Sequence, residues 1–125
     1  MDGDTALTHR IIGCAIEVHK TLGPGLLESI YESALCVEFK ATALPHKRQV
    51  GIPLYYKGEL IAEFRPDLIV DDKVIVEVKS VEQLAPIHTA QVLTYLRVTS
   101  LRIGLILNFN SPTIQQGTRR VVLNA

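Results

Sequence analysis

Hydrophobic and polar positions follow a helical period over the first third of the chain. Apolar residues recur at spacings of three and four between Thr5 and Thr21, and again between Leu26 and Ala41, a pattern typical of helices that bury one face. Gly23-Pro24-Gly25 separates the two segments and is a strong helix breaker. The sequence therefore predicts two helices, and the second is expected to turn these side chains toward a core: Leu27, Ile30, Tyr31, Ala34, Leu35 and Val37.

The pattern changes to alternation after Pro45. Apolar residues occupy every second position from Val50 to Tyr56, and β-branched runs around polar turns follow. Alternation and β-branched runs are both typical of strands. Three strands are expected, over residues 49–56, 60–70 and 74–78. Because short polar turns join them, we predict an antiparallel meander.

The turn between the second and third strands sets their register. A loop of three residues between Val70 and Val74 would pair these two valines and place Asp67 opposite Glu77. Pro66 lies inside the second predicted strand, and proline cannot donate a ladder hydrogen bond. We therefore expect a bulge or bend at this proline that re-aims Asp67.

The last third of the chain predicts a helix followed by a strand. The helix is expected to start near Pro86 and end near Thr99, and the apolar run 101–109 reads as a buried strand. A right-handed crossover would set this strand parallel to the one that carries Glu77. A polar loop and an edge strand over 119–123 complete the chain. The predicted fold class is α/β, with a mixed central sheet flanked by helices.

Two carboxylates and an amine interrupt the apolar strands. Directly opposed residues of an antiparallel pair have Cβ atoms roughly 4.5–5.5 Å apart, so Asp67 and Glu77 could share one divalent cation. Lys79 follows two residues after Glu77 and projects from the same face. This trio suits metal-assisted hydrolysis of a phosphodiester. The alternative is an ordinary edge strand, whose polar residues face solvent and whose lysine discourages pairing with other chains.

Two motifs resemble those of known nucleases. Pro66-Asp67 with Glu77-Val78-Lys79 is similar to the motif of the PD-(D/E)XK nuclease superfamily. Gly25-Leu26-Leu27-Glu28-Ser29-Ile30-Tyr31 resembles the signature of the small GxxExxY protein family, which is usually placed within that superfamily. The resemblance extends from about Ile11 to Phe109. It implies a restriction-endonuclease-like core.

The resemblance also implies roles for single residues. Asp67 and Glu77 match metal ligands, and Lys79 matches the catalytic amine. Glu28 matches an acidic residue that related nucleases place on a helix before the sheet, where it would complete the metal shell. The implied cofactor is Mg²⁺ or Mn²⁺, and the implied substrate is nucleic acid, with DNA as the first expectation.

Gln91 and Tyr95 resemble the Q-x-x-x-Y helix motif of the RecB-like branch of the superfamily. Their spacing of four places them on one helical face, so Gln91 is a candidate site residue. The alternative is that the tyrosine packs in the core and the glutamine is exposed. Glu32 lies one turn after Glu28 and is a candidate of lower rank.

Composition limits the remaining possibilities. The chain has 125 residues, of which 47% are hydrophobic and 21% charged, values expected of one soluble globular domain. No apolar run approaches the roughly 20 residues of a membrane span, and a cytoplasmic location is the default expectation. Thirteen basic and thirteen acidic residues cancel, which is unusual for a strong non-specific DNA binder. A local basic rim could still form from these residues: Lys47, Arg48, Lys57, Arg65, Arg97, Arg102, Arg119 and Arg120.

Two function classes remain open on the sequence alone. The first is a metal-dependent nuclease that uses Asp67, Glu77 and Lys79. The second is a catalytically inactive binding or assembly module of the same fold, which the neutral net charge favours. Such a module could pair through exposed edge strands. A homodimer is also a hypothesis for a nuclease this small, because a small domain often needs a partner to contact both strands of a duplex.

Overall fold

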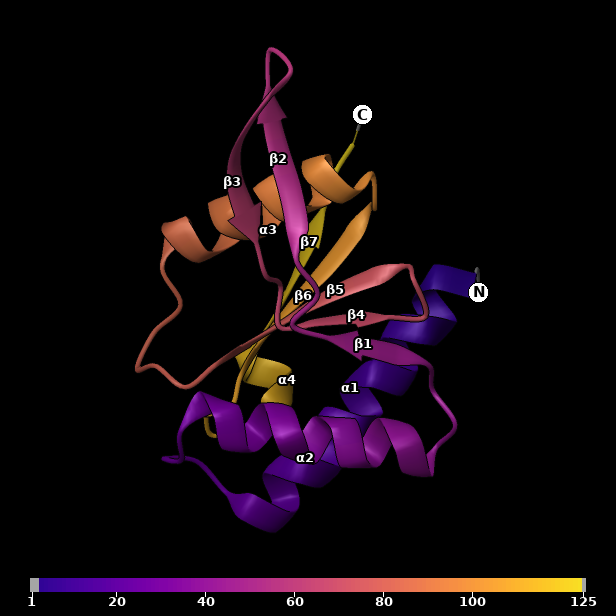
Figure 1. The fold of residues 1–125 in the computed structure, drawn as a ribbon. Helices are drawn as coiled ribbons and strands as arrows, with labels where there is room; N and C mark the ends of the chain where they lie inside the picture. Colours follow the sequence, from indigo (N-terminus) through magenta and orange to yellow (C-terminus); the bar gives the residue numbers. More distant parts are fainter. Residues whose placement is uncertain (1–2, 125) are drawn as a thin grey trace.

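The computed structural model describes residues 3–124. In this range the helices are α1 (Gly3–Leu22), α2 (Glu28–Ala41), α3 (Pro86–Thr99) and the short α4 (Ile114–Gly117). The strands are β1 (His46–Arg48), β2 (Ile52–Tyr56), β3 (Glu59–Phe64), β4 (Leu68–Val70), β5 (Val74–Lys79), β6 (Ile103–Asn108) and β7 (Thr118–Val122). Figure 1 shows them arranged around a central sheet.

The central sheet is mixed, as predicted. Its strand order is β1-β4-β5-β6-β7, in which β5 and β6 are parallel and the other neighbours are antiparallel. Helix α3 makes the crossover between the two parallel strands, and β7 is an edge strand, so both of these predictions are confirmed. The α/β fold class with a mixed sheet flanked by helices is therefore confirmed.

Helices cover both faces of the sheet. Helices α1 and α2 lie on one face and α3 on the other (Figure 1), and we call these the α1/α2 face and the α3 face. Alternation along the strands divides the core accordingly: Val74, Val76 and Val78 of β5 belong to the cluster with α1 and α2, whereas Ile75 belongs to the cluster with α3. Strand β5 thus contributes side chains to both apolar clusters.

Helix α3 approaches the sheet closely at Gly104. A Cβ atom at this position would lie 2.5 Å from Cγ1 of Val92 on the helix. Because Gly104 has no side chain, α3 can pack this close to β6.

The predicted meander is wrong. Strand β1 pairs with β4, and β2 and β3 form a separate two-stranded sheet. The strand predicted over 49–56 begins only at Ile52, and a separate strand, β1, precedes it. Gln49 lies between the two strands in a left-handed conformation with φ of 55°. The predicted strand 60–70 is likewise divided between Phe64 and Leu68, at the bend expected around Pro66.

The β2–β3 hairpin extends away from the central sheet, as Figure 1 shows. One side of it packs on α3, where the rings of Phe64 and Tyr95 are 5.5 Å apart between centroids. Large apolar side chains on the rest of the hairpin are exposed: Tyr55, Tyr56, Leu60 and Ile61. Alternation correctly indicated two strands here but could not tell which sheet they join.

The second helix buries a different face from the one predicted. Tyr31 and Leu35 are buried as expected, but Leu27, Ile30 and Val37 are exposed. The polar Glu32 is also buried on this helix. No helix of residues 3–124 combines the length and apolar character that a membrane span requires.

Candidate metal centre

Asp67 and Glu77 meet at the ends of two neighbouring strands. The register pairs Val70 with Val74 and Leu68 with Val76, so the predicted register is confirmed and the next opposed pair is Asp67 and Glu77. A hydrogen bond joins the two carboxyl groups. The backbone N–H of Val78 also donates to Oδ2 of Asp67 over 2.8 Å.

Burial makes Glu77 an unusual acid. The residue is only 4% exposed. Burial, the hydrogen bond with Asp67 and the charge of Asp67 together raise the pKa of Glu77 to about 9, whereas the charge of Lys79 opposes the rise. Glu77 therefore keeps its proton at neutral pH, and Asp67 is the acceptor of the pair.

Lys79 lies on the same face of β5 as Glu77, two residues further along. It is half-buried and pairs in register with Asn108 of β6. Asn108 is buried, and its side chain bonds both the N–H and the C=O of Val81. This amide fixes the chain that leaves β5, a role that sequence patterns did not indicate because the contact joins distant segments.

Helix α3 covers the carboxyl pair. Tyr95 is buried, and its hydroxyl forms a hydrogen bond with Gln91, so the two residues share one helical face as predicted. Burial raises the pKa of Tyr95, and the charges of Glu77 and Asp67 raise it further. Gln91 is exposed at the edge of this roof. The structure thus brings Asp67, Glu77 and Tyr95 together, with Gln91 one contact away.

Glu28 reaches the end of β5 from the first turn of α2. Its Oε2 atom accepts a hydrogen bond of 3.0 Å from the N–H of Ser80, the residue after Lys79. The hydroxyl of Ser80 donates in turn to the C=O of Leu26 over 2.8 Å. These bonds hold the start of α2 against the end of the strand that carries Glu77.

The side chain of Tyr31 holds the turn that precedes Glu28. Its hydroxyl donates to the C=O of Gly23 and accepts from the N–H of Leu26 over 3.1 Å. Its ring is fully buried and stacks on Phe109 at 4.5 Å between centroids. Gly25 has φ of 96°, a conformation that side chains disfavour. Glycine and tyrosine thus shape the turn that presents Glu28.

Comparison with known families now adds to this geometry. A family model described as PD-(D/E)XK nuclease superfamily matches residues 5–121. The chain belongs to the PD-(D/E)XK nuclease superfamily. No curated protein and no solved structure matches the chain significantly. Nucleases of this superfamily generally use divalent metal ions, and the carboxylate oxygens of the pair are the ligand type that Mg²⁺ and Mn²⁺ prefer.

The three predicted metal ligands do not form one group. Within residues 3–124, no three His, Cys, Asp or Glu side chains lie close enough together to hold a metal ion. Asp67 and Glu77 adjoin, while Glu28 is engaged with Ser80. Asp67 and Glu77 are therefore a hydrogen-bonded pair, with Glu28 at the same end of β5.

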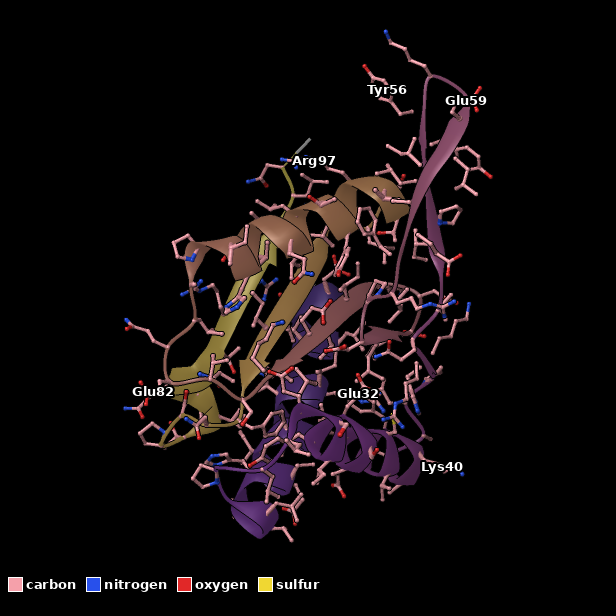
Figure 2. All side chains as sticks on the ribbon, turned by 60° about the vertical axis from the view of Figure 1, so that its left-hand side comes forward. Glu32, Lys40, Tyr56, Glu59, Glu82 and Arg97 are labelled. Carbon is pink, nitrogen blue, oxygen red and sulfur yellow. The ribbon has the colours of Figure 1, made fainter. Side chains whose placement is uncertain are left out.

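A second acidic residue, Glu32, connects to the pair through Gln49. The amide nitrogen of Gln49 lies 2.9 Å from Oε1 of Glu32 and 3.2 Å from Oδ1 of Asp67. Arg48 donates to Oε2 of Glu32 over 2.6 Å. Burial raises the pKa of Glu32, the bond from Arg48 opposes this, and the charge of Asp67 raises it further. Figure 2 labels Glu32 on α2, at the opposite end of the molecule from Tyr56 and Glu59 at the hairpin tip.

Most of the residues predicted to form a basic rim make ion pairs or hydrogen bonds with other residues of the protein. Ion pairs join Lys47 to Asp72, Arg48 to Glu32 and Arg65 to Glu63. Hydrogen bonds join Arg119 to Thr89 and Arg120 to Thr8. The structure therefore does not gather these cations into one free surface beside the carboxyl pair.

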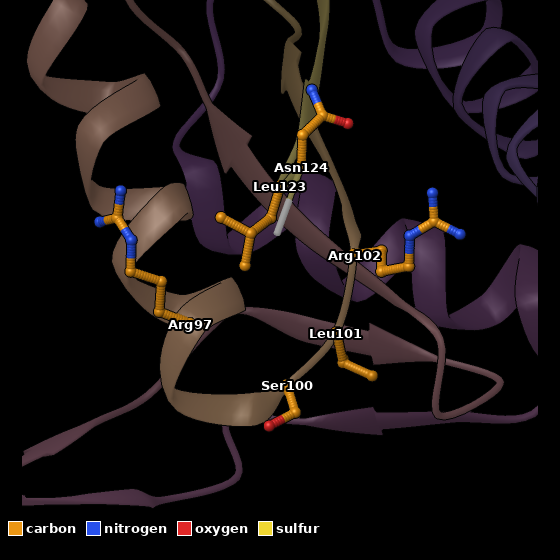
Figure 3. A pocket seen from close by; sticks show the side chains of 6 residues that line it. All are labelled: Arg97, Ser100, Leu101, Arg102, Leu123 and Asn124. Carbon is orange, nitrogen blue, oxygen red and sulfur yellow. The ribbon is translucent and has the colours of Figure 1, made fainter.

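Two further arginines line a pocket at the other end of the sheet. It has a volume of about 550 Å³ and is lined by these residues: Arg97, Ser100, Leu101, Arg102, Leu123 and Asn124. It adjoins the start of β6, whereas Lys79 lies beside the end of that strand. Figure 3 shows the guanidinium groups of Arg97 and Arg102 extending away from each other. The pocket is thus separate from the candidate metal centre.

Proposed function

We propose that this protein is a metal-dependent nuclease that hydrolyses phosphodiester bonds of nucleic acid, with DNA as the first expected substrate. Asp67 and Glu77 hold Mg²⁺ or Mn²⁺, and Lys79 supplies positive charge beside them. The observation that carries this proposal is the hydrogen-bonded pair of half-buried Asp67 and buried Glu77, next to Lys79, in a chain of the PD-(D/E)XK nuclease superfamily.

The residues of the pair fit a divalent cation chemically. In the metal-free protein Glu77 holds a proton, and a cation would replace that proton because metal ligands must be deprotonated. A bound cation would polarise a phosphate and make hydroxide available near neutral pH. Lys79 orients a water molecule or stabilises developing charge on the phosphate.

Glu28 and Gln91 take supporting positions in this proposal. Glu28 reaches the residue after Lys79, and a change of its side-chain rotamer could add a further oxygen ligand. Gln91 contacts Tyr95 above the pair and is placed to contact substrate from the edge of α3. Both roles are extensions of the superfamily match to these positions.

The test is a cleavage assay with labelled single-stranded, duplex and branched DNA and with RNA. Each substrate is incubated with Mg²⁺ or Mn²⁺ and with the intact protein, Lys79→Ala or Glu77→Ala. We expect cleavage by the intact protein only, with a loss of at least about 100-fold in each variant. Lys73→Ala is the matched control, because Lys73 is an exposed lysine at the β4–β5 turn. Equal cleavage by Lys79→Ala and the intact protein would reject the catalytic role of Lys79.

A second candidate function is a catalytically inactive binding or assembly module. The internal engagement of the arginines and the zero net charge favour it, as do the exposed apolar side chains of the β2–β3 hairpin. Such a module could form a homodimer through the hairpin edges. Light scattering distinguishes a monomer of 13.8 kDa from a dimer, and Tyr55→Ser with Leu60→Ser should abolish a dimer formed in this way.

A further inference from the structure

Gln49 occupies an unusual backbone position beside the candidate metal centre. Its φ of 55° is in the left-handed region, which non-glycine residues seldom adopt because of contact between Cβ and the backbone. Strained conformations of this kind persist where surrounding contacts determine them, and they concentrate at functional sites. The hydrogen bonds that Gln49 makes in this conformation therefore indicate its role.

Two hydrogen bonds of its backbone groups fix Gln49 against the segment that leads into β4. Its N–H donates to the C=O of Asp67 over 3.0 Å, one step beyond the last residue pair of β1 and β4. Its C=O accepts a bond of 2.9 Å from the guanidinium of Arg65. Because Arg65 precedes Asp67 by two residues, both bonds tie Gln49 to the bend around Pro66.

The side-chain amide of Gln49 then bridges two carboxylates. Its nitrogen lies 3.2 Å from Oδ1 of Asp67 and 2.9 Å from Oε1 of Glu32. Glu32 is itself buried and held by Arg48 over 2.6 Å. The amide of Gln49 thus links Asp67 to a fixed point on helix α2.

Asp67 is consequently held at both carboxylate oxygens. Oδ2 accepts from the N–H of Val78 and Oδ1 accepts from Gln49. One bond alone would leave the carboxylate free to rotate, whereas two bonds define its plane. A carboxylate oxygen can accept two bonds. In the metal-free protein one of the Asp67 oxygens also accepts from Glu77, and a cation that replaces that proton would take this position.

We propose that Gln49 is a positioning residue that orients the Asp67 carboxylate for binding of a divalent cation. This inference rests on the proposed function, because it assigns Gln49 to the same metal centre. Partners that orient metal ligands typically change metal affinity by 10- to 100-fold when they are removed. We therefore expect an effect of about this size from loss of the amide.

Glycine is the most informative replacement at this position. Gln49→Gly removes the amide and at the same time accepts positive φ without strain. If Gln49 served only the fold, this variant would change stability without changing the metal affinity of the folded protein. Gln49→Leu removes the amide while retaining side-chain bulk, and it provides a second, independent variant.

The experiment measures Mn²⁺ affinity by calorimetry and thermal unfolding of the metal-free protein for each variant. Ser100→Gly is the matched control, because Ser100 has φ of 62° and lies at the end of α3 away from the carboxyl pair. We expect Mn²⁺ affinity to fall by about 10-fold or more in Gln49→Gly while the protein stays folded. Ser100→Gly should bind Mn²⁺ as the intact protein does.

The outcomes separate the two proposals. Equal Mn²⁺ affinity of Gln49→Gly, Gln49→Leu and the intact protein would overturn the role of Gln49 and leave the metal centre in place. Absence of Mn²⁺ binding by the intact protein would overturn the metal centre and the positioning role together. Weakened binding in both Gln49 variants, with Ser100→Gly unchanged, would establish the inference.

Discussion

The two faces of the central sheet are built from the same strands but differ in character. On the α1/α2 face the inner strands β4, β5 and β6 contribute apolar residues, such as Val74, Val76 and Leu105, and only the outer strands add polar ones: Arg48 of β1 bonds α2 and Arg120 of β7 bonds α1. On the α3 face the same strands carry a smaller apolar cluster and, at one end, the carboxyl pair of Asp67 and Glu77. Successive side chains of β5 point to opposite faces of the sheet. Its residues on the α1/α2 face therefore pack in the core, whereas Glu77, a candidate site residue, lies on the α3 face.

The α3 face shows how a small domain accommodates a buried acid. Burial of a charged group away from water costs several kcal/mol unless it is compensated. Glu77 avoids much of this cost by remaining protonated beside Asp67. The larger apolar face supplies the stability that the polar face lacks, so substitutions on the two faces should have distinguishable consequences.

Among single substitutions, the strongest loss of stability is expected on the apolar face. Leu105 is 1% exposed in the cluster with α1 and α2, and Leu105→Ala should lower the free energy of unfolding by about 2–5 kcal/mol through lost burial and a residual cavity. Urea unfolding measures this change. Mn²⁺ affinity should be unchanged under conditions where the variant stays folded. Leu60→Ala on the exposed hairpin is the control, with an expected change within about 0.5 kcal/mol.

The second effect is a pH dependence on the α3 face. The pKa of Glu77 is about 9 in the folded protein, above the roughly 4.3 of an unfolded glutamate. Between these values the folded state holds the extra proton, so the stabilisation is complete at low pH and is lost as the pH rises through 9. The metal-free protein should lose up to about 1.4 kcal/mol of unfolding free energy per pH unit in this window.

Glu77→Gln isolates that contribution. The amide is similar in size, can donate to Asp67 and does not titrate, so the difference in stability between the intact protein and the variant should shrink or reverse as the pH rises from 5 to 8. Urea unfolding at several pH values without metal measures the difference. A constant difference over this range would show that Glu77 does not hold a proton in the folded state.

The sequence predicted the local geometry of the carboxyl pair well. The polar turn after Val70 determined the register, and the register placed Asp67 opposite Glu77. The crossover through α3 followed from strand, helix and strand order together with the handedness rule. These features depend on neighbours in sequence and on general chain geometry, which a pattern can reveal.

Features that depend on distant contacts escaped prediction. Gln49 connects to Asp67 across 18 residues of chain and follows no recognisable pattern. Glu32 was a candidate of lower rank because it lies one turn after Glu28, but its connection to Asp67, 35 residues away as the difference of their numbers shows, was not predicted. Val37 looked like a core residue by its spacing but is exposed, because the orientation of α2 is set by burial of Tyr31 and Leu35. Tertiary packing determines which face of such a helix is buried, and the spacing of apolar residues alone does not reveal that packing.

The third effect concerns the closeness of α3 to the sheet. Gly104→Ala would place a Cβ atom 2.5 Å from Cγ1 of Val92, and a β-branched residue in a helix has little rotamer freedom to move away. We expect a loss of about 1–3 kcal/mol from overpacking, measured by thermal or urea unfolding. Adding Val92→Ala should recover part of the loss, so the two substitutions should be less than additive. Strictly additive losses would contradict a direct clash between these residues.

The smallest expected effect is that of the Tyr95 hydroxyl on the α3 face. Tyr95→Phe removes the hydrogen bond with Gln91 and retains the ring that packs against Phe64. The free energy of unfolding should fall by about 0.5–1.5 kcal/mol, clearly less than in Leu105→Ala. Tyr56→Phe is the matched control, because Tyr56 is 61% exposed at the hairpin tip. A loss as large as that of Leu105→Ala would mean that the polar contacts of the α3 face contribute as much to stability as the apolar packing of the opposite face.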